Sequence, residues 1–203
     1  MSLTARKLTR ISAAEYLAAE NDGTWRHEFI NGVMFAMAGA SERHNLIRSR
    51  LTATLLGHGA QGCRVFDAEM KLHIKDNADE RYYYPDVFVS CDPNDRDPYS
   101  RNTAVLVVEV LSPSTERIDR FEKFEAYKCI PSLLEYGLLS QDAMELELFR
   151  RRTDWQREFY QRDNTVTFES VGLTINVSRL YRDIHFEDPM LAPPTAPAAR
   201  GSQ

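Results

Sequence analysis

The chain has 203 residues, of which 43% are hydrophobic, and its formal net charge is −5. This length and apolar content are enough for one well-packed domain. The negative charge excludes an overall basic field that would draw the chain to nucleic acid or anionic lipid, although it leaves room for a local basic groove.

Cysteine usage and hydropathy indicate the compartment. Cys63, Cys91 and Cys129 are odd in number, far apart and without a C-x-x-C motif, which argues against a disulfide framework or a zinc site. No segment approaches the roughly 18 apolar residues of a membrane span, and no apolar stretch of signal-peptide kind follows the basic start. We therefore expect a soluble cytoplasmic protein with reduced cysteines and no membrane partner.

The first third of the chain carries clear local signals. The sequence SAAE at residues 12–15 is a capping box, which predicts a short helix to about residue 20. Asn31-Gly32 separates two apolar-rich runs and predicts a two-residue hairpin. From residue 41, apolar residues at helical spacing predict a long amphipathic helix that ends near residues 57–59.

The rest of the chain predicts mostly strands. Four runs read as strands before a helix that begins at residues 114–115 and ends at Ile130-Pro131: CRVFDA, EMKLHI, PDVFVS and AVLVVEVLS. Four more strands and a short helical piece at SRLYRDI are expected after it: SLLEYGLLS, MELELFRR, WQREFYQ and VTFES. We expect one α/β or α+β domain over residues 1–188 and a disordered Pro- and Ala-rich tail over residues 189–203.

Glu109 is a carboxylate inside the apolar run AVLVVEVLS. An isolated ionised carboxylate is too costly to bury, so it is normally neutralised, paired or bound to a metal. If PDVFVS and AVLVVEVLS are antiparallel neighbours joined by a loop centred near residues 97–98, Asp86 lies directly opposite Glu109, with the Cβ atoms about 5 Å apart.

Two carboxylates facing each other destabilise an apolar edge, whereas a divalent cation between them turns the same geometry into a binding site. Mg²⁺ takes oxygen ligands and keeps several waters, so this pair with a main-chain carbonyl would suffice. The alternative is a protonated carboxylate, or one that is hydrogen-bonded to the turn at residues 112–115. For a single buried glutamate that alternative is favoured; for the pair we favour metal.

Lys123 is the third component. Asp119, Lys123 and Tyr127 follow one another at i, i+4 spacing on the helix that starts just after the strand of Glu109. The lysine can therefore reach a metal and a phosphate at that end of the sheet. An ordinary Asp119–Lys123 surface ion pair is the commoner outcome of such spacing.

These segments together resemble a known family. YPDVFV, VVEVLSPSTERIDRFEKFEAY, IPSLLEY and the upstream HEFINGVMFAMAGASERHNLI look like the Uma-two family of restriction-endonuclease-like proteins, within the PD-(D/E)XK nuclease superfamily, over most of residues 10–160. The resemblance implies an α/β (α+β) fold with a restriction-endonuclease-like mixed central sheet flanked by helices, to which further antiparallel strands are added toward the C-terminus. It also implies magnesium-dependent phosphodiester hydrolysis.

The resemblance assigns roles residue by residue. Asp86 matches the motif aspartate and Glu109 the motif acid, whereas the motif lysine falls at Leu111, which cannot serve. In this family a lysine of the following helix substitutes, and here it is Lys123. Glu28, in HEFINGV, matches an upstream glutamate that approaches the same site.

Other residues are weaker candidates. A meander would pair Lys71 near Asp86, although a strand-face lysine is the simpler interpretation. His44 lies on the long helix and can border the cleft. Tyr82–Tyr84 could stack on bases, but aromatic strand ends are more often structural. Gly137 stands where the family usually has an aromatic residue, and this departure bears on packing.

Two functions follow as hypotheses. In the first, Asp86, Glu109 and the Val110 carbonyl hold Mg²⁺ or Mn²⁺, Lys123 orients the attacking water or offsets charge on phosphorus, and Glu28 supports them. The substrate would be nucleic acid, DNA in the first place, and a homodimer would most simply cut both strands of a duplex.

The second hypothesis is a catalytically inactive nuclease fold that serves as a nucleic-acid- or protein-binding module. The acidic charge favours it slightly, because phosphate contacts usually need a cationic surface. A basic groove beside Asp86, formed by Arg117, Arg120 and Lys128, would favour the enzyme.

Overall fold

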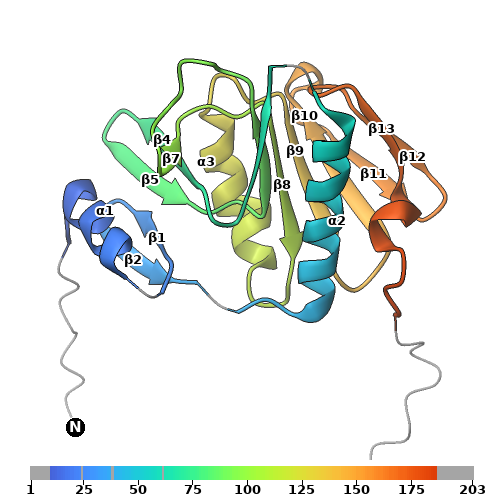
Figure 1. Cartoon of the computed structure of the whole chain (residues 1–203), viewed down its shortest axis with the longest axis horizontal. Coiled ribbons are helices and arrows are strands. Elements are labelled where there is room, and N and C mark those ends of the chain that lie inside the picture. The colour runs from blue at the N-terminus through green and yellow to red at the C-terminus, as the bar shows by residue number, and fades with distance from the viewer. Residues whose placement is uncertain (1–9, 24, 38, 61, 187–203) are drawn as a thin grey trace, which may run out of the picture.

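The computed structural model describes residues 10–23, 25–37, 39–60 and 62–186, so the expected tail at residues 189–203 lies outside the described residues. Within these ranges a large mixed sheet and a small sheet lie side by side, with helices against them (Figure 1). None of the helices in these ranges has the length and apolar character needed to cross a membrane.

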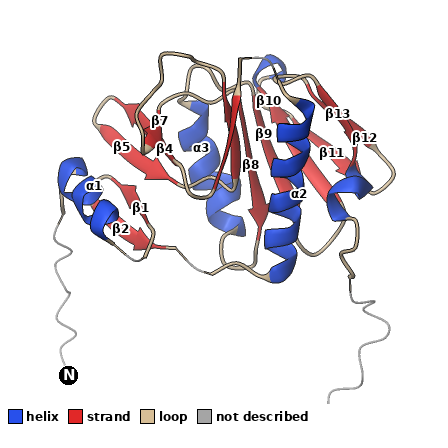
Figure 2. Ribbon diagram, viewed as in Figure 1, coloured by secondary structure: helices blue, strands red, loops and turns tan. Residues whose placement is uncertain are grey.

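In the described part of the chain the large sheet has six strands, in the order β11-β10-β9-β8-β6-β3. Their bounds, in that order, are Arg157–Gln161, Glu145–Arg150, Glu135–Ser140, Leu106–Leu111, Val87–Ser90 and Arg64–Asp67. β8 and β9 pair in parallel, whereas the other neighbours pair antiparallel. The predicted mixed central sheet flanked by helices is therefore confirmed (Figure 2).

The small sheet has five strands among the described residues, in the order β2-β1-β5-β4-β7. Their bounds are Val33–Ala36, His27–Ile30, Asp79–Tyr83, Lys71–Asp76 and Ser100–Arg101. A separate hairpin joins β12 to β13, which span Thr165–Phe168 and Leu173–Asn176. The strands β5 and β13 were not predicted, and the expected meander from EMKLHI directly to PDVFVS is wrong because β5 intervenes.

Two of the helices cover opposite faces of the large sheet, whereas the first helix packs against the small sheet. α1 spans Ala13–Asp22, α2 spans Glu42–His58, and a π-helical turn at Ile118–Lys123 (the π-turn) leads into α3 at Phe124–Lys128. Apolar residues of α2 pack with the even-numbered β8 residues, and those of α3 pack with odd-numbered ones. Short 3-10 helices occur at Arg151–Thr153 and Val177–Tyr181, the second of which confirms the helical piece expected at SRLYRDI.

The capping box, the hairpin turn and the end of the long helix that the sequence predicted are present in the structure. The Ser12 side chain caps α1 and completes the predicted capping box with Glu15. Asn31 and Gly32 have φ of 49° and 91°, as the predicted hairpin turn between β1 and β2 requires. α2 ends at Gly59 in the left-handed conformation.

The register of β6 on β8 is the one predicted. Val87 lies opposite Val108 and Phe88 opposite Val107, which places Asp86 beside Glu109 at the end of the ladder. On the other side of β8, Val108 lies opposite Gly137. A Cβ at Gly137 would lie 3.2 Å from Val108 Cγ2, so this close packing explains a glycine where an aromatic residue was expected.

The expectation of reduced cysteines is wrong for two of the three. A disulfide joins Cys63 to Cys91, whose Cα atoms are 4.0 Å apart, and Cys129 is an exposed free thiol. Arg64 pairs with Ser90 across β3 and β6, so the two cysteines occupy the next cross-strand position. The spacing of 28 residues in sequence gave no sign of this pairing.

Loss of the disulfide should destabilise the fold. The Cys63→Ser/Cys91→Ser double variant is expected to lose about 3 kcal/mol of unfolding free energy, because the bond closes a loop of 28 residues in the unfolded chain. Urea denaturation measures this, with Cys129→Ser as the control that should match wild type. Wild-type stability unchanged by a thiol reductant would contradict the prediction.

Candidate metal and nuclease site

Glu109 is the centre of the site. It lies on β8, is 2% exposed, and faces α3 together with the other odd-numbered residues of the strand. Tyr127 Oη donates to its Oε1 at 2.8 Å, and the Asp86 amide donates to its Oε2 at 2.9 Å. The side chain is therefore fixed in both position and orientation.

Asp86 is held just before β6 by the opposite strand. Its Oδ2 accepts a hydrogen bond from the Val110 amide at 2.8 Å, and its Oδ1 lies 2.9 Å from His44 Nε2. Each carboxylate thus accepts a backbone N–H from the other's segment. The prediction that Asp86 and Glu109 meet at one end of adjacent antiparallel strands is confirmed, while their roles stay predictions.

Lys123 joins this pair from the π-turn. Its Nζ lies 2.9 Å from Glu28 Oε1, 3.3 Å from Asp119 Oδ1 and 3.4 Å from Glu109 Oε1. The lysine is only 7% exposed, so the alternative of an ordinary surface ion pair is wrong. Glu28 reaches it from β1 of the small sheet, as the family resemblance implied.

The π-turn fixes where Lys123 points. π-helical turns are rare and frequently occur at functional sites. Tyr136, on β9, donates from its hydroxyl to the Asp119 carbonyl at 2.8 Å and so anchors the turn to the large sheet. Asp119 and Lys123 therefore project from a supported segment toward Glu109.

Burial and crowding shift the pKa values of these groups. Burial raises the pKa of Glu109 well above its ordinary value, and the neighbouring Asp119 and Asp86 add to this, while Lys123 opposes it. Burial also raises the pKa of Asp119. Burial by itself would lower the pKa of Lys123, but the surrounding carboxylates outweigh it and hold that pKa well above its usual range. The carboxylates Glu109, Glu28 and Asp119 therefore stabilise the protonated form of Lys123.

A hard cation fits this donor set. Within the described ranges, no group of three or more His, Cys, Asp or Glu side chains is arranged to hold a metal ion by itself. Mg²⁺ is usually bound by one or two carboxylates together with waters and substrate phosphates. Asp86 and Glu109 can supply the two carboxylates. The register places Pro85 opposite Val110, and proline has no N–H to donate to the Val110 carbonyl. This carbonyl is therefore suited to be the expected third ligand.

The site opens into a cleft of about 350 Å³. Its walls include Asp86, Glu109, Glu28, Asp119 and Lys123, together with His44, which does border the cleft as expected. Tyr127 lies behind Glu109 and is fully buried.

Lys71 does not join the cleft. Leu72 pairs with Tyr83, so Lys71 falls opposite Tyr84, two residues short of Asp86. The Lys71 Nζ lies 5.3 Å from the centre of the Tyr84 ring. The predicted pairing of Lys71 near Asp86 is wrong because the hairpin turn is centred on residues 77–78, which sets Lys71 opposite Tyr84.

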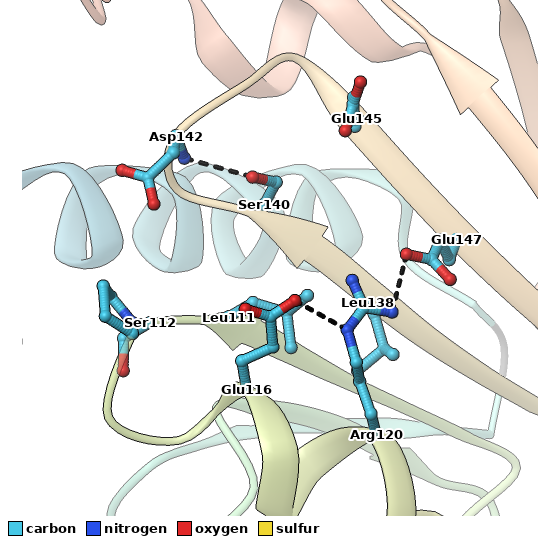
Figure 3. Close-up of a pocket in the computed structure, with 10 residues that line it drawn as sticks. Leu111, Ser112, Glu116, Arg120, Leu138, Ser140, Asp142, Glu145 and Glu147 are labelled. Carbon is cyan, nitrogen blue, oxygen red and sulfur yellow. Dashed lines mark hydrogen bonds and ion pairs between the residues drawn. The ribbon is translucent and has the colours of Figure 1, made fainter.

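The expected basic groove is not formed by Arg120 and Lys128. Arg120 donates to Glu116 and Glu147 in a neighbouring pocket of about 220 Å³ that shares Ser112 with the cleft (Figure 3). Lys128 pairs with Glu125 at 2.6 Å. Neither cation lines the cleft, nor does the exposed Arg117.

Among the cleft residues that were not predicted from the sequence are Arg48 and Phe35. Arg48 lines the cleft one turn after His44 on α2, so the i, i+4 spacing could have identified it. Phe35 also lines the cleft, from β2. Its position directly across the hairpin from Glu28 follows from the Asn31-Gly32 turn and could have been recognised.

Comparison with known proteins gives consistent matches. The model of the Uma2 family, described as "Putative restriction endonuclease", matches residues 13–178. Two uncharacterized proteins of Synechocystis sp. are similar: one is 36% identical over 87% of this chain and 94% of its own, the other 35% identical over 72% and 84%. A crystal structure from Anabaena variabilis, described as "a putative nuclease belonging to DUF820", has the same fold, with a TM-score of 0.66 and 16% identity over 84% of this chain and 97% of that one.

Proposed function

The chain belongs to the Uma2 family, and from this premise we propose that it is a metal-dependent endonuclease that hydrolyses phosphodiester bonds of nucleic acid, with DNA as the expected substrate. The observation that carries the proposal is the buried Lys123, whose ammonium group is surrounded by Glu28, Glu109 and Asp119 beside Asp86. A buried cation among several acids at the wall of a cleft marks a candidate catalytic site, and a buried ion pair is by itself weak evidence for a stabilising role.

Asp86, Glu109 and the Val110 carbonyl would hold Mg²⁺ or Mn²⁺, which when bound supplies Lewis-acid charge and a more acidic water. Other residues of the chain hold these carboxylates in position. Tyr127 and the Asp86 amide keep the Glu109 carboxylate in place. His44 orients Asp86.

Lys123 would act on the phosphate. Its ammonium group stays protonated because of the acids around it, so it offsets the negative charge that develops on the phosphoryl oxygens in the transition state. Glu28 and Asp119 position the ammonium group through their contacts at 2.9 and 3.3 Å.

A second function is a nuclease fold that binds nucleic acid or protein without cleavage. The shortage of free cations around the cleft favours it, since Arg120 and Lys128 are already paired with acids. The presence in the cleft of Asp86, Glu109 and Lys123, the residues proposed for hydrolysis, argues against this second function.

The deciding experiment is incubation of the protein with plasmid, single-stranded DNA and RNA in Mg²⁺, Mn²⁺ or EDTA. We expect cleavage that depends on the metal and falls about 100-fold or more in Asp86→Asn. Asp142→Asn, an exposed acid of the neighbouring pocket, is the control that should keep wild-type activity. Binding of nucleic acid or protein without any cleavage would favour the module instead.

A further inference from the structure

One wall of the cleft is apolar and open to solvent. Phe35 on β2 and Ile118 at the start of the π-turn both line it, and they are 49% and 42% exposed. Ile118 directly precedes Asp119, and Phe35 lies directly opposite Glu28 in the β1–β2 hairpin. Large apolar side chains are thus exposed beside the acids that hold Lys123.

The distances connect this wall to the reacting groups. Cross-strand partners have Cβ atoms about 5 Å apart and share a face of the sheet, so the Phe35 ring is the neighbour of the Glu28 carboxylate. Glu28 is 2.9 Å from the Lys123 ammonium group. Phe35 and the Lys123 ammonium group therefore both neighbour Glu28, which puts Phe35 within reach of a nucleotide whose phosphate would lie at Lys123.

The charges of the cleft disfavour a duplex. Among its described wall residues the acids are Glu28, Asp86, Glu109, Asp119 and Glu122, against the cations Arg48 and Lys123. Duplex DNA carries one negative charge per about 1.7 Å of its axis and needs a broad cationic surface. A single nucleotide brings one phosphate and an uncharged base, and the cleft of about 350 Å³ has the size of a small-ligand site.

We propose that Phe35, with Ile118, forms a stacking surface for an unpaired nucleobase, so that the substrate at this site is single-stranded or locally unpaired nucleic acid. The inference rests on the proposed function and names its substrate class. Aromatic rings bind bases without regard to sequence, because every base has a flat face. An apolar surface of a second copy of this chain is the competing occupant.

The test is a binding titration that does not depend on cleavage. Fluorescein-labelled phosphorothioate oligonucleotides, one a single strand and one the same strand fully paired in a blunt-ended duplex, are titrated with the full chain in Mn²⁺, and anisotropy is recorded. The variants are Phe35→Ala, Phe35→Leu and Phe35→Tyr. Phe159→Ala is the matched control, because Phe159 is also 49% exposed but lies on β11, away from the cleft.

We expect the wild-type chain to bind the single strand at least about tenfold more tightly than the duplex. Phe35→Ala should lose about tenfold of that affinity, Phe35→Leu should stay weak, and Phe35→Tyr and Phe159→Ala should match wild type. The melting temperature and sedimentation of each variant are measured alongside. Since Phe35 is half-exposed, Phe35→Ala should stay folded.

Other outcomes overturn the inference in different ways. Equal affinity for duplex and single strand, or an unchanged affinity of Phe35→Ala for the single strand, would contradict the stacking surface. Metal-dependent cleavage of plasmid in the same preparation would still support the proposed function. A change from dimer to monomer in Phe35→Ala would assign the surface to a second copy. If the wild-type chain neither binds nor cleaves any nucleic acid, the proposed function fails and the inference fails with it.

Discussion

Lys123→Ala is expected to lower the free energy of unfolding by about 3 kcal/mol and to abolish hydrolysis. The substitution leaves Glu28, Glu109 and Asp119 without the ammonium group they surround. Removing one partner of a buried ion pair costs about 3–5 kcal/mol, because the remaining charge stays in a poorly solvated place. Urea denaturation measures the loss, and cleavage assays measure the activity.

The control for this variant is Lys128→Ala. Lys128 pairs with the exposed Glu125 one turn away, and surface pairs of this kind contribute at most about 0.5 kcal/mol. Metal stabilisation should be kept in Lys123→Ala, since the lysine serves the reaction and not the ion. A Lys123→Ala protein as stable as wild type would show that the acids do not depend on this counterion.

Glu109→Gln is expected to abolish the response of the melting temperature to Mg²⁺ or Mn²⁺. A metal that binds the native state stabilises wild type by about 2.7 kcal/mol at one hundred times its dissociation constant. Glutamine keeps the shape of Glu109 but not its charge, so the ion loses a ligand. Without metal the variant should melt at the wild-type temperature or above, because burial disfavours the charged form of Glu109 most and, together with the repulsion from Asp119 and Asp86, outweighs the attraction of Lys123. Calorimetry with and without metal compares the two proteins.

Glu147→Gln is the matched control here. Glu147 is a buried acid that pairs with Arg120 in the neighbouring pocket, so this variant should keep the metal response. If wild type shows no metal-dependent shift and Glu109→Gln melts lower, Glu109 is a hydrogen-bonded structural acid. The nuclease proposal would then give way to the binding module.

The sequence was sufficient to predict the centre of the site. Loop length and strand pattern set the register of β6 on β8, and helical spacing after the strand placed Lys123 near its end. These features are local or depend on one loop. Together with the alternation of side chains across a sheet, they are enough to predict which side chains meet. The partnership of Glu28 with Lys123 came only from the family resemblance, since nothing local links β1 to the π-turn.

The errors concern pairings that depend on the whole fold. β5 reads as a polar and tyrosine-rich segment, and its strand character comes from lying between β1 and β4. The two-residue displacement of Lys71 came from the hairpin turn between β4 and β5, whose centre lies one residue earlier than expected, at residues 77–78. The disulfide between Cys63 and Cys91 required the pairing of the edge strand β3 with β6, which no spacing in the sequence reveals. The expected basic groove also failed because Arg120 pairs with Glu147, which lies on β10, distant in the sequence.

Lys123 also has a mechanical consequence. Its ammonium group contacts Glu28 of the small sheet and Glu109 of the large sheet, so it connects the two sheets at their junction. Sub-global opening separates cooperative units of a fold before it unfolds completely. Because Tyr136 anchors the π-turn to the large sheet, an opening that parts the sheets must break the Lys123–Glu28 contact and leave two buried charges unpaired, and this couples the small sheet to the large one. The residues proposed for catalysis therefore also determine how far the molecule can open while it remains folded.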